Sequence, residues 1–346
     1  MSFRPKTLAR GLRAEGGALL PVAVLVVMAV VFVVLVGTAD QSITSANGYN
    51  ILQNVALYGW VALALGLTMI AGEFDLSTPA MFTLGGVVAA LVGGSPAVAI
   101  GAAVAAGIVV GVVQGLLVAR LDISSVAVTL AGYIVLSGVA LTVSGNEITT
   151  HTNLDFGFEI DRPILEVFSV RSLVVLAGFA LIGLLLRYTR IGTELRAVGN
   201  DRRAARVAGV PIARRVVLVF VLSAVGAAAS GALVSYSLST AAPNVNLEPL
   251  IFGVTAIVLG GVSVYGGKGT ALGILIGVIA LSLLEEGLVL LAIPDYVANI
   301  VTGGLLAVVA LIAAPDLLRG GVAALRRDRH EGAAGAPVDA TGATSR

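Results

Sequence analysis

The chain has 346 residues, of which 58% are hydrophobic and 12% are charged, and its mean hydropathy is +1.01. Soluble domains contain about 45–50% apolar and about 25% charged residues, so this composition excludes an ordinary soluble protein. The lack of cysteine excludes disulfides and thiolate metal sites, and the net charge of +1 gives no indication of a nucleic-acid partner.

The first apolar run follows a basic N-terminal segment, residues 1–17. Residues 18–36 carry no charge, and this run is too long for a signal peptide, whose apolar region spans about 7–15 residues. A bilayer-spanning helix needs about 20 mostly apolar residues. The sequence therefore predicts an uncleaved first span and an all-α polytopic membrane protein, with about ten transmembrane helices in one bundle over residues 18–316. These spans are 18–37, 50–71, 77–94, 96–119, 124–144, 170–187, 213–237, 249–264, 270–292 and 296–314.

The basic residues orient this bundle, because lysine and arginine collect on the cytoplasmic side of short loops. With the N-terminus inside, alternation through ten spans places every lysine and arginine inside except Arg162 and Arg171. Both termini are then cytoplasmic. The acidic loop 145–169 lies outside, as a solvated loop or as a docking surface for a soluble partner. The tail 317–346, rich in alanine and glycine, is predicted to be disordered.

Polar residues near the start of the second and third spans are candidates for a translocation pathway. Gln53 and Asn54 could bind hydroxyl groups of a substrate or could bridge two helices. Asp75 precedes the third span and Ser77 is its first residue. They either cap that helix, whose first turn holds Pro79, or lie at a helix break beside the pathway.

Further polar residues lie within the spans. Thr129 and Tyr133 form a stripe with Ser137 on the fifth span, which could line a pathway or bond to a neighbouring helix. Glu285 and Glu286 lie in the outer half of the ninth span, and acids inside a membrane are functional candidates by default. An ion-coupled secondary transporter would need such an acid.

The chain contains no nucleotide-binding motif. The segment "YGGKGT" (265–270) resembles part of a phosphate-binding loop, but Val262 and Gly269 stand where that pattern requires glycine and serine or threonine. The two histidines lie in a loop and in the tail, so an intramembrane enzyme has little support. We therefore expect neither a catalytic site nor a metal site.

The cytoplasmic loop 188–212 contains the densest cluster of arginines. Asn200 is a suitable N-cap, Asp201 to Ala208 would form two helical turns, and Gly209 stands where a left-handed C-terminal residue belongs. Ala204, Val207 and Ala208 would share one apolar face. The loop is either a basic segment near anionic lipid headgroups or a helix that fits a groove on another protein.

Three stretches resemble one family. "AVGNDRRAARVAGV" (197–210) is similar to the cytoplasmic coupling loop of ATP-binding cassette (ABC) importer permeases of the ribose type, with Asn200 one place earlier than in the family pattern. "GEFDLSTPAMFTLGG" (72–86) and "GGVSVYGGKGTALG" (260–273) resemble two further family motifs in the expected order. Thr78-Pro79 departs from the usual Val-Gly. The resemblance covers residues 50 to 315.

The resemblance implies a permease subunit in the inner membrane of a prokaryote, surrounded by membrane lipids. It would pair with a second copy or a homologue, and receive a monosaccharide or polyol from a soluble binding protein. Nucleosides or branched-chain amino acids are alternative substrates. Two ATPase subunits, or one fused double ATPase, would bind ATP and magnesium, so this chain needs no cofactor. The predicted ATPase-coupling residues are Asn200, Asp201, Arg202, Arg203, Ala204, Ala205, Arg206, Ala208 and Gly209, the alanines filling a groove on the partner and the arginines rimming it.

Overall fold

The computed structural model describes residues 8–38 and 42–313, so residues 1–7 and the predicted disorder of 317–346 lie outside the described residues. In chain order the elements are α1 (Leu8–Thr38), α2 (Ser45–Ile70), α3 (Thr78–Val92), α4 (Pro96–Leu121), α5 (Ser125–Val143), β1 (Thr149–Thr150), α6 (Asp155–Asp161), α7 (Val170–Tyr188), α8 (Arg190–Asn200), α9 (Arg202–Val207), α10 (Ile212–Ser237), β2 (Thr240–Ala241), α11 (Glu248–Leu259), α12 (Ala271–Leu290) and α13 (Asp295–Ala313). The only sheet in these ranges is the antiparallel pair β1–β2.

The helices agree with the predicted spans in position. Seven helices in the described ranges are long and apolar enough to cross a membrane, and three shorter apolar helices cover Thr78–Val92, Glu248–Leu259 and Tyr296–Val309. The predicted eighth span was too long at its C-terminal end, because α11 stops at Leu259 and the chain turns through Gly260 and Gly261. At about 1.5 Å per residue, α3 and α11 are each shorter than the hydrocarbon core of about 30 Å.

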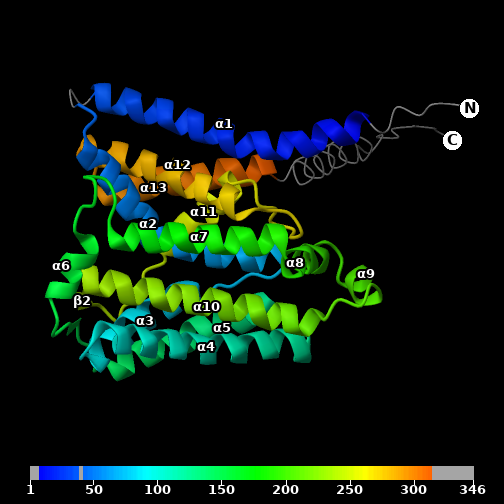
Figure 1. The fold of residues 1–346 in the computed structure, drawn as a ribbon, viewed down its shortest axis with the longest axis horizontal. Coiled ribbons are helices and arrows are strands. Elements are labelled where there is room, and N and C mark those ends of the chain that lie inside the picture. The colour runs from blue at the N-terminus through cyan, green and yellow to red at the C-terminus, as the bar shows by residue number, and fades with distance from the viewer. Residues whose placement is uncertain (1–7, 39–41, 314–346) are drawn as a thin grey trace, which may run out of the picture. The chain divides into compact units, whose positions relative to one another are not determined.

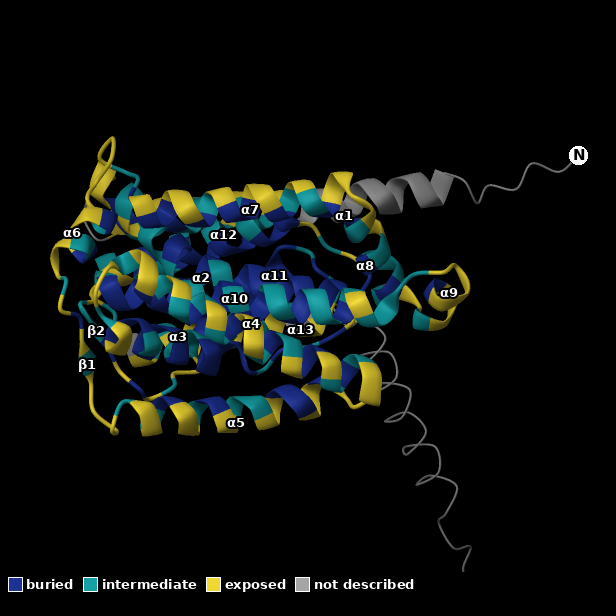
Figure 2. Ribbon diagram, turned by 60° about the horizontal axis from the view of Figure 1, so that its bottom comes forward, coloured by how far each residue is buried: buried dark blue, intermediate teal, exposed yellow. Residues whose placement is uncertain are grey.

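The chain divides into two units, residues 1–306 and 307–346, and the second contributes only the last turns of α13 to the described residues. In the first unit, α10 packs against α2, α3 and α4, and α2 also packs against α7, α11 and α12. Figure 2 shows α2 and α11 largely buried, whereas α5 presents many exposed residues. The exposed residues of α5 are mostly aliphatic, which suits a surface in contact with lipid.

Small residues set the close approach of α4 and α10. A Cβ added to Gly111 would lie 2.5 Å from Cα of Val221, and one added to Gly107 would lie 2.8 Å from the Ala224 carbonyl oxygen. Packing this close strengthens dispersion contacts in lipid, where apolar burial does not drive helices together. At one end of the bundle lie α6 and β2, and at the other lie α8 and α9 (Figure 1).

Candidate functional site

The predicted cytoplasmic helix exists as α9, but its N-terminus is one residue later than predicted. Asp201 is the N-cap, and its carboxylate accepts hydrogen bonds from the backbone N–H groups of Arg203 (2.8 Å) and Ala204 (3.0 Å). The prediction of Asn200 as the cap was wrong. Asn200 ends the preceding helix α8, and its side-chain amide donates to the Arg196 carbonyl at 2.9 Å. The backbone of Asp201 is extended, as a cap requires.

Gly209 ends α9 in the left-handed conformation, with φ of +79°. The N–H of Gly209 donates to the Arg206 carbonyl and the N–H of Val210 donates to the Ala205 carbonyl, both at 3.0 Å. This pair of bonds is a Schellman motif, which satisfies carbonyls that the end of a helix leaves free. The predicted role of Gly209 as the helix stop is confirmed.

The exposure of the α9 residues corrects one predicted partner contact. Ala205 is only 3% exposed and belongs to the core of this chain, so it does not face a partner. Val207 is 91% exposed, and Ala204 and Ala208 are exposed beside it. We define the coupling surface as the exposed residues of this region: Arg203, Ala204, Arg206, Val207 and Ala208.

Helix α8, which the sequence analysis missed, attaches α9 to the bundle. Leu195 and Val198 are 0% and 2% exposed, and Glu194 forms an ion pair with Arg215 at the start of α10. The spacing of Ile191, Leu195 and Val198 is the signal that would have revealed an amphipathic helix.

The three sequence stretches that carry the family resemblance meet in space. Gly199, the penultimate residue of α8, lies against the loops that follow α2 and α11. A Cβ on Gly199 would overlap the Ile70 carbonyl oxygen and lie 2.6 Å from the Gly267 nitrogen. That nitrogen donates to the Ile70 carbonyl at 3.0 Å. A Cβ on Gly266 would lie 2.8 Å from both the Gly199 carbonyl oxygen and Cα of Gly72. We call these four residues, 72, 199, 266 and 267, the glycine junction.

An ion pair adds a second link between α9 and the loop that joins α2 to α3. Arg202 contacts the carboxylate of Glu73, which lies in that loop. Glu73 is only 7% exposed. Arg202 also lies 3.9 Å from the exposed Asp122. Arg202 was predicted to rim a partner's groove, whereas the structure pairs it with Glu73 within the chain. Loss of Arg202 would leave Glu73 buried without its cation, which is more costly than loss of an exposed pair.

Asp75 and Ser77 hold the α2–α3 loop in the bundle. Asp75 is 1% exposed, and its carboxylate accepts from Ser77 Oγ (2.6 Å), from the Ser77 backbone N–H (3.0 Å) and from Ser223 Oγ of α10 (2.7 Å). Gln114 of α4 donates to Ser77 Oγ at 2.9 Å. These bonds satisfy the polar groups of a loop that would be costly to expose to lipid.

The stripe on α5 splits into two environments. Thr129 is fully buried and its hydroxyl accepts from the backbone N–H of Leu76 at 3.0 Å, so it also secures the α2–α3 loop. Tyr133 is partly buried and lies one turn further along α5, where its carbonyl accepts from Ser137 Oγ at 2.6 Å.

Gln53 bridges helices. Its side-chain oxygen accepts from Arg171 of α7 at 2.6 Å, and Arg171 forms an ion pair with Asp161 at 3.1 Å. Asn54 is partly buried, and its side chain makes no hydrogen bond within the described residues. Of this predicted amide pair, only Asn54 therefore has its side-chain hydrogen-bonding groups free.

The two acids of α12 differ in their surroundings. Glu286 is 3% exposed and accepts from the side-chain amides of Asn47 and Asn50 on α2, each at 3.1 Å. Glu285 is partly buried and makes no hydrogen bond within the described ranges. Glu286 thus joins α12 to the start of α2.

A pocket of about 320 Å³ opens near the end of the bundle that holds β2, and the sequence analysis did not find it. Buried His151 stacks on Tyr236, and its Nε2 forms a hydrogen bond with Ser235 Oγ at 2.9 Å. This bond fixes the position of Ser235, which lines the pocket. Burial lowers the pKa of His151. In the sequence, the turn residues of "PNVNLEP" (243–249) were the signal that could have indicated this pocket. The pocket is lined by Phe82, Thr83, Gly86, Gly231, Val234, Ser235, Leu238, Thr240, Ala241, Ala242, Asn244, Asn246 and Pro249.

Comparison with known proteins identifies relatives over most of the chain. Residues 47–310 match the family described as the branched-chain amino acid transport system permease component. The L-arabinose ABC transporter permease protein AraH of Azospirillum brasilense is 32% identical, covering 86% of this chain and 90% of its own. The ribose import permease protein RbsC of Bacillus subtilis is 30% identical, covering 82% and 89%. No solved structure matches.

Proposed function

Because the chain belongs to the branched-chain amino acid transport permease family, we propose that it is the membrane subunit of an ATP-driven importer of a monosaccharide or related polyol. One observation carries the substrate class: relatives at about 30% identity over more than four fifths of the chain are named for arabinose and ribose. As a permease component the chain is not itself an enzyme, and it is a multi-pass membrane protein.

Reconstitution tests this function. We expect proteoliposomes that contain the permease, its cognate ATPase and its binding protein to accumulate a labelled pentose, hexose or polyol when ATP is present. The binding protein, screened by thermal shift against sugars, nucleosides and branched-chain amino acids, identifies which compound to label. Uptake of only a nucleoside or an amino acid would contradict the monosaccharide assignment.

We propose that substrate enters through the pocket beside β2. Thr83, Ser235, Asn244 and Asn246 supply hydroxyl and amide groups, and Phe82 supplies an apolar face. Such a combination suits a small polyhydroxylated molecule, whose hydroxyls need directional partners. The pathway residues predicted from sequence are reassigned in this proposal. Asp75, Ser77 and Thr129 hold the loop that precedes α3, one of the helices lining the pocket, and Gln53 bridges α2 to Arg171 of α7.

We further propose ten membrane crossings with both termini in the cytoplasm, seven by the long helices and three by the shorter ones together with their adjoining loops. Reporter fusions after Asp155 and after Asp201 should then report opposite sides of the membrane, with Asp201 inside. The same side for both fusions would contradict this topology.

The partners follow from the two ends of the bundle. Two ATPase subunits, or one fused double ATPase, would bind the coupling surface on two permease copies and would hold the ATP and magnesium. The soluble binding protein would dock at the opposite end, where the loop 145–169 exposes Phe158 (75%) and Leu165 (84%) among acids such as Glu159. Exposed apolar residues with charged neighbours are typical of protein contacts.

The acids of α12 are not expected to carry a coupling proton. Replacing Glu285 and Glu286 together with glutamine should leave ATP-driven uptake largely intact, because glutamine can still accept the bonds from Asn47 and Asn50. Uptake is measured in proteoliposomes with and without a protonophore at constant ATP. Abolished uptake in the variant, together with protonophore sensitivity of the unmodified protein, would indicate a secondary transporter instead.

A further inference from the structure

A groove of about 680 Å³ runs between α7 and α12, on the outside of two candidate membrane spans. Most of its length is aliphatic or aromatic, with Leu176, Phe179 and Leu184 on α7 and Leu272 and Leu275 on α12. Leu184 and Leu272 are 56% and 66% exposed. A surface of this composition on a membrane helix faces hydrocarbon chains.

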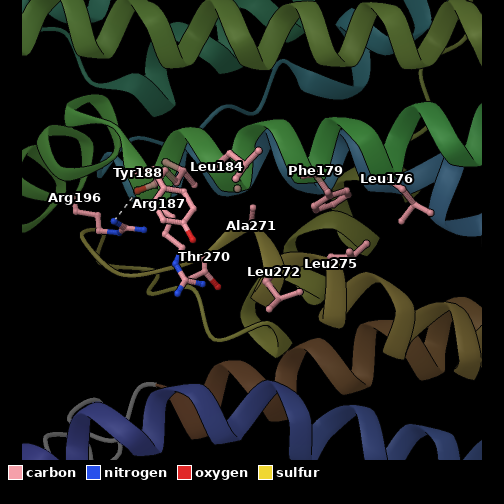
Figure 3. Close-up of a pocket in the computed structure, with 13 residues that line it drawn as sticks. Leu176, Phe179, Leu184, Arg187, Tyr188, Arg196, Thr270, Ala271, Leu272 and Leu275 are labelled. Carbon is pink, nitrogen blue, oxygen red and sulfur yellow. Dashed lines mark hydrogen bonds between the residues drawn. The ribbon is translucent and has the colours of Figure 1, made fainter.

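One end of the groove is basic (Figure 3). The close-up shows the side chains of Arg187 and Arg196 gathered near Thr270, away from Leu176 at the far end. Neither arginine forms an ion pair within the part of the chain that the structure describes: Arg196 donates to the Leu186 carbonyl at 3.0 Å, and the Arg187 guanidinium lies 5.4 Å from the Tyr188 ring centroid. The nearby acid Glu194 is already paired with Arg215.

We propose that this groove binds an anionic phospholipid. The phosphodiester and head group lie between Arg187 and Arg196, and an acyl chain lies along the leucines and Phe179. Guanidinium groups bind phosphate oxygens with charge-assisted hydrogen bonds, and basic pockets between membrane helices are suited to anionic head groups. The ring of Tyr188 is exposed at this basic end of the groove. Tyrosine side chains are enriched at the boundary between lipid and water, so this end of the groove suits a lipid head group.

The position of the groove gives the lipid a structural role. Thr270 caps α12, since its hydroxyl accepts from the Gly273 N–H at 3.0 Å, and it follows directly on the loop that carries Gly266 and Gly267. Arg196 belongs to α8, which carries Gly199. A lipid held here contacts Thr270 and Arg196, which lie on the two segments that carry Gly267 and Gly199 of the glycine junction. This role does not depend on which substrate the protein transports.

Native mass spectrometry of the purified full-length permease tests the proposal. With palmitoyl-oleoyl phosphatidylglycerol and phosphatidylcholine supplied in equal amounts, we expect preferential retention of phosphatidylglycerol. Replacing either Arg187 or Arg196 with glutamine should lower this retention about fivefold, which is the effect expected for one basic residue near an anionic lipid surface. Replacing both should lower it further. Ala180→Phe, which fills the groove from an exposed position, should lower it with both arginines intact.

The matched control replaces Arg203 and Arg206 on α9, which removes the same charge from exposed positions outside the groove. This control should retain phosphatidylglycerol, and excess inorganic phosphate should not displace it. Equal retention of the two lipids, an equal loss in the control, or displacement by inorganic phosphate would overturn the proposal. Loss of a permease dimer in Ala180→Phe without a change in lipid retention would instead assign the groove to a second copy of this chain.

Discussion

Replacing Gly199 with alanine is expected to reduce uptake at least about fivefold while leaving the permease in the membrane. The new Cβ would overlap the Ile70 carbonyl and press on the Gly267 nitrogen, so it would separate two backbone segments that are joined by a hydrogen bond. Overpacking of this kind costs about 1–3 kcal/mol, and about 1.4 kcal/mol corresponds to a factor of ten in rate. Uptake and membrane abundance are measured together.

The reason for so large an effect is the place of Gly199 in the chain. It lies between the coupling surface on α9 and the loops that precede α3 and α12. If α9 couples to an ATPase as proposed, motion imposed on α9 would pass through this backbone contact. The ATPase subunits should still co-purify with the variant, because the caps of α9 remain intact, and ATP hydrolysis should continue without uptake.

A matched substitution separates this contact from a general effect of alanine. Gly138→Ala places the same methyl group in the middle of α5, where nothing lies within 4 Å of the added atom. Uptake by this control should be unchanged. Normal uptake by Gly199→Ala would show that the glycine junction does not transmit the motion.

Val207→Asp is expected to weaken co-purification of the ATPase subunits at least about tenfold. Val207 is a large apolar residue of α9 that is 91% exposed, and a carboxylate there would be buried without a partner if the helix enters an apolar groove. The permease itself should fold normally, because a side chain that is 91% exposed makes few contacts within its own chain. Pull-down of the complex from solubilised membranes measures the loss.

The control for this variant is Leu165→Asp, which makes the same kind of change at an 84% exposed residue between α6 and α7. Helix α6 lies at the opposite end of the bundle from α9 (Figure 1). It should leave the ATPase bound. Ala205→Trp is unsuitable for testing this contact, because Ala205 is buried and a large side chain there would detach α9 from the bundle. If Val207→Asp keeps its ATPase and transports normally, the partner does not bind the coupling surface.

The sequence by itself determined the positions of the long apolar helices and the C-terminal end of α9. Lipid requires long apolar runs for a spanning helix, so hydropathy locates the long helices within a few residues. The end of α9 at Gly209 could also be predicted from local sequence, because glycine adopts the left-handed conformation there without strain. These features depend only on consecutive residues and on their preference for lipid or water, and both can be read from the sequence.

Only the tertiary structure decided which polar and small residues meet. Gly72, Gly199 and Gly267 lie far apart in sequence, and their contact depends on how three helix ends pack. The packing of α9 against the bundle buries Ala205 and leaves Val207 exposed, although both have apolar side chains. Helix periodicity says which residues share a face, but only the packed neighbours determine whether that face meets the core of the chain or a partner.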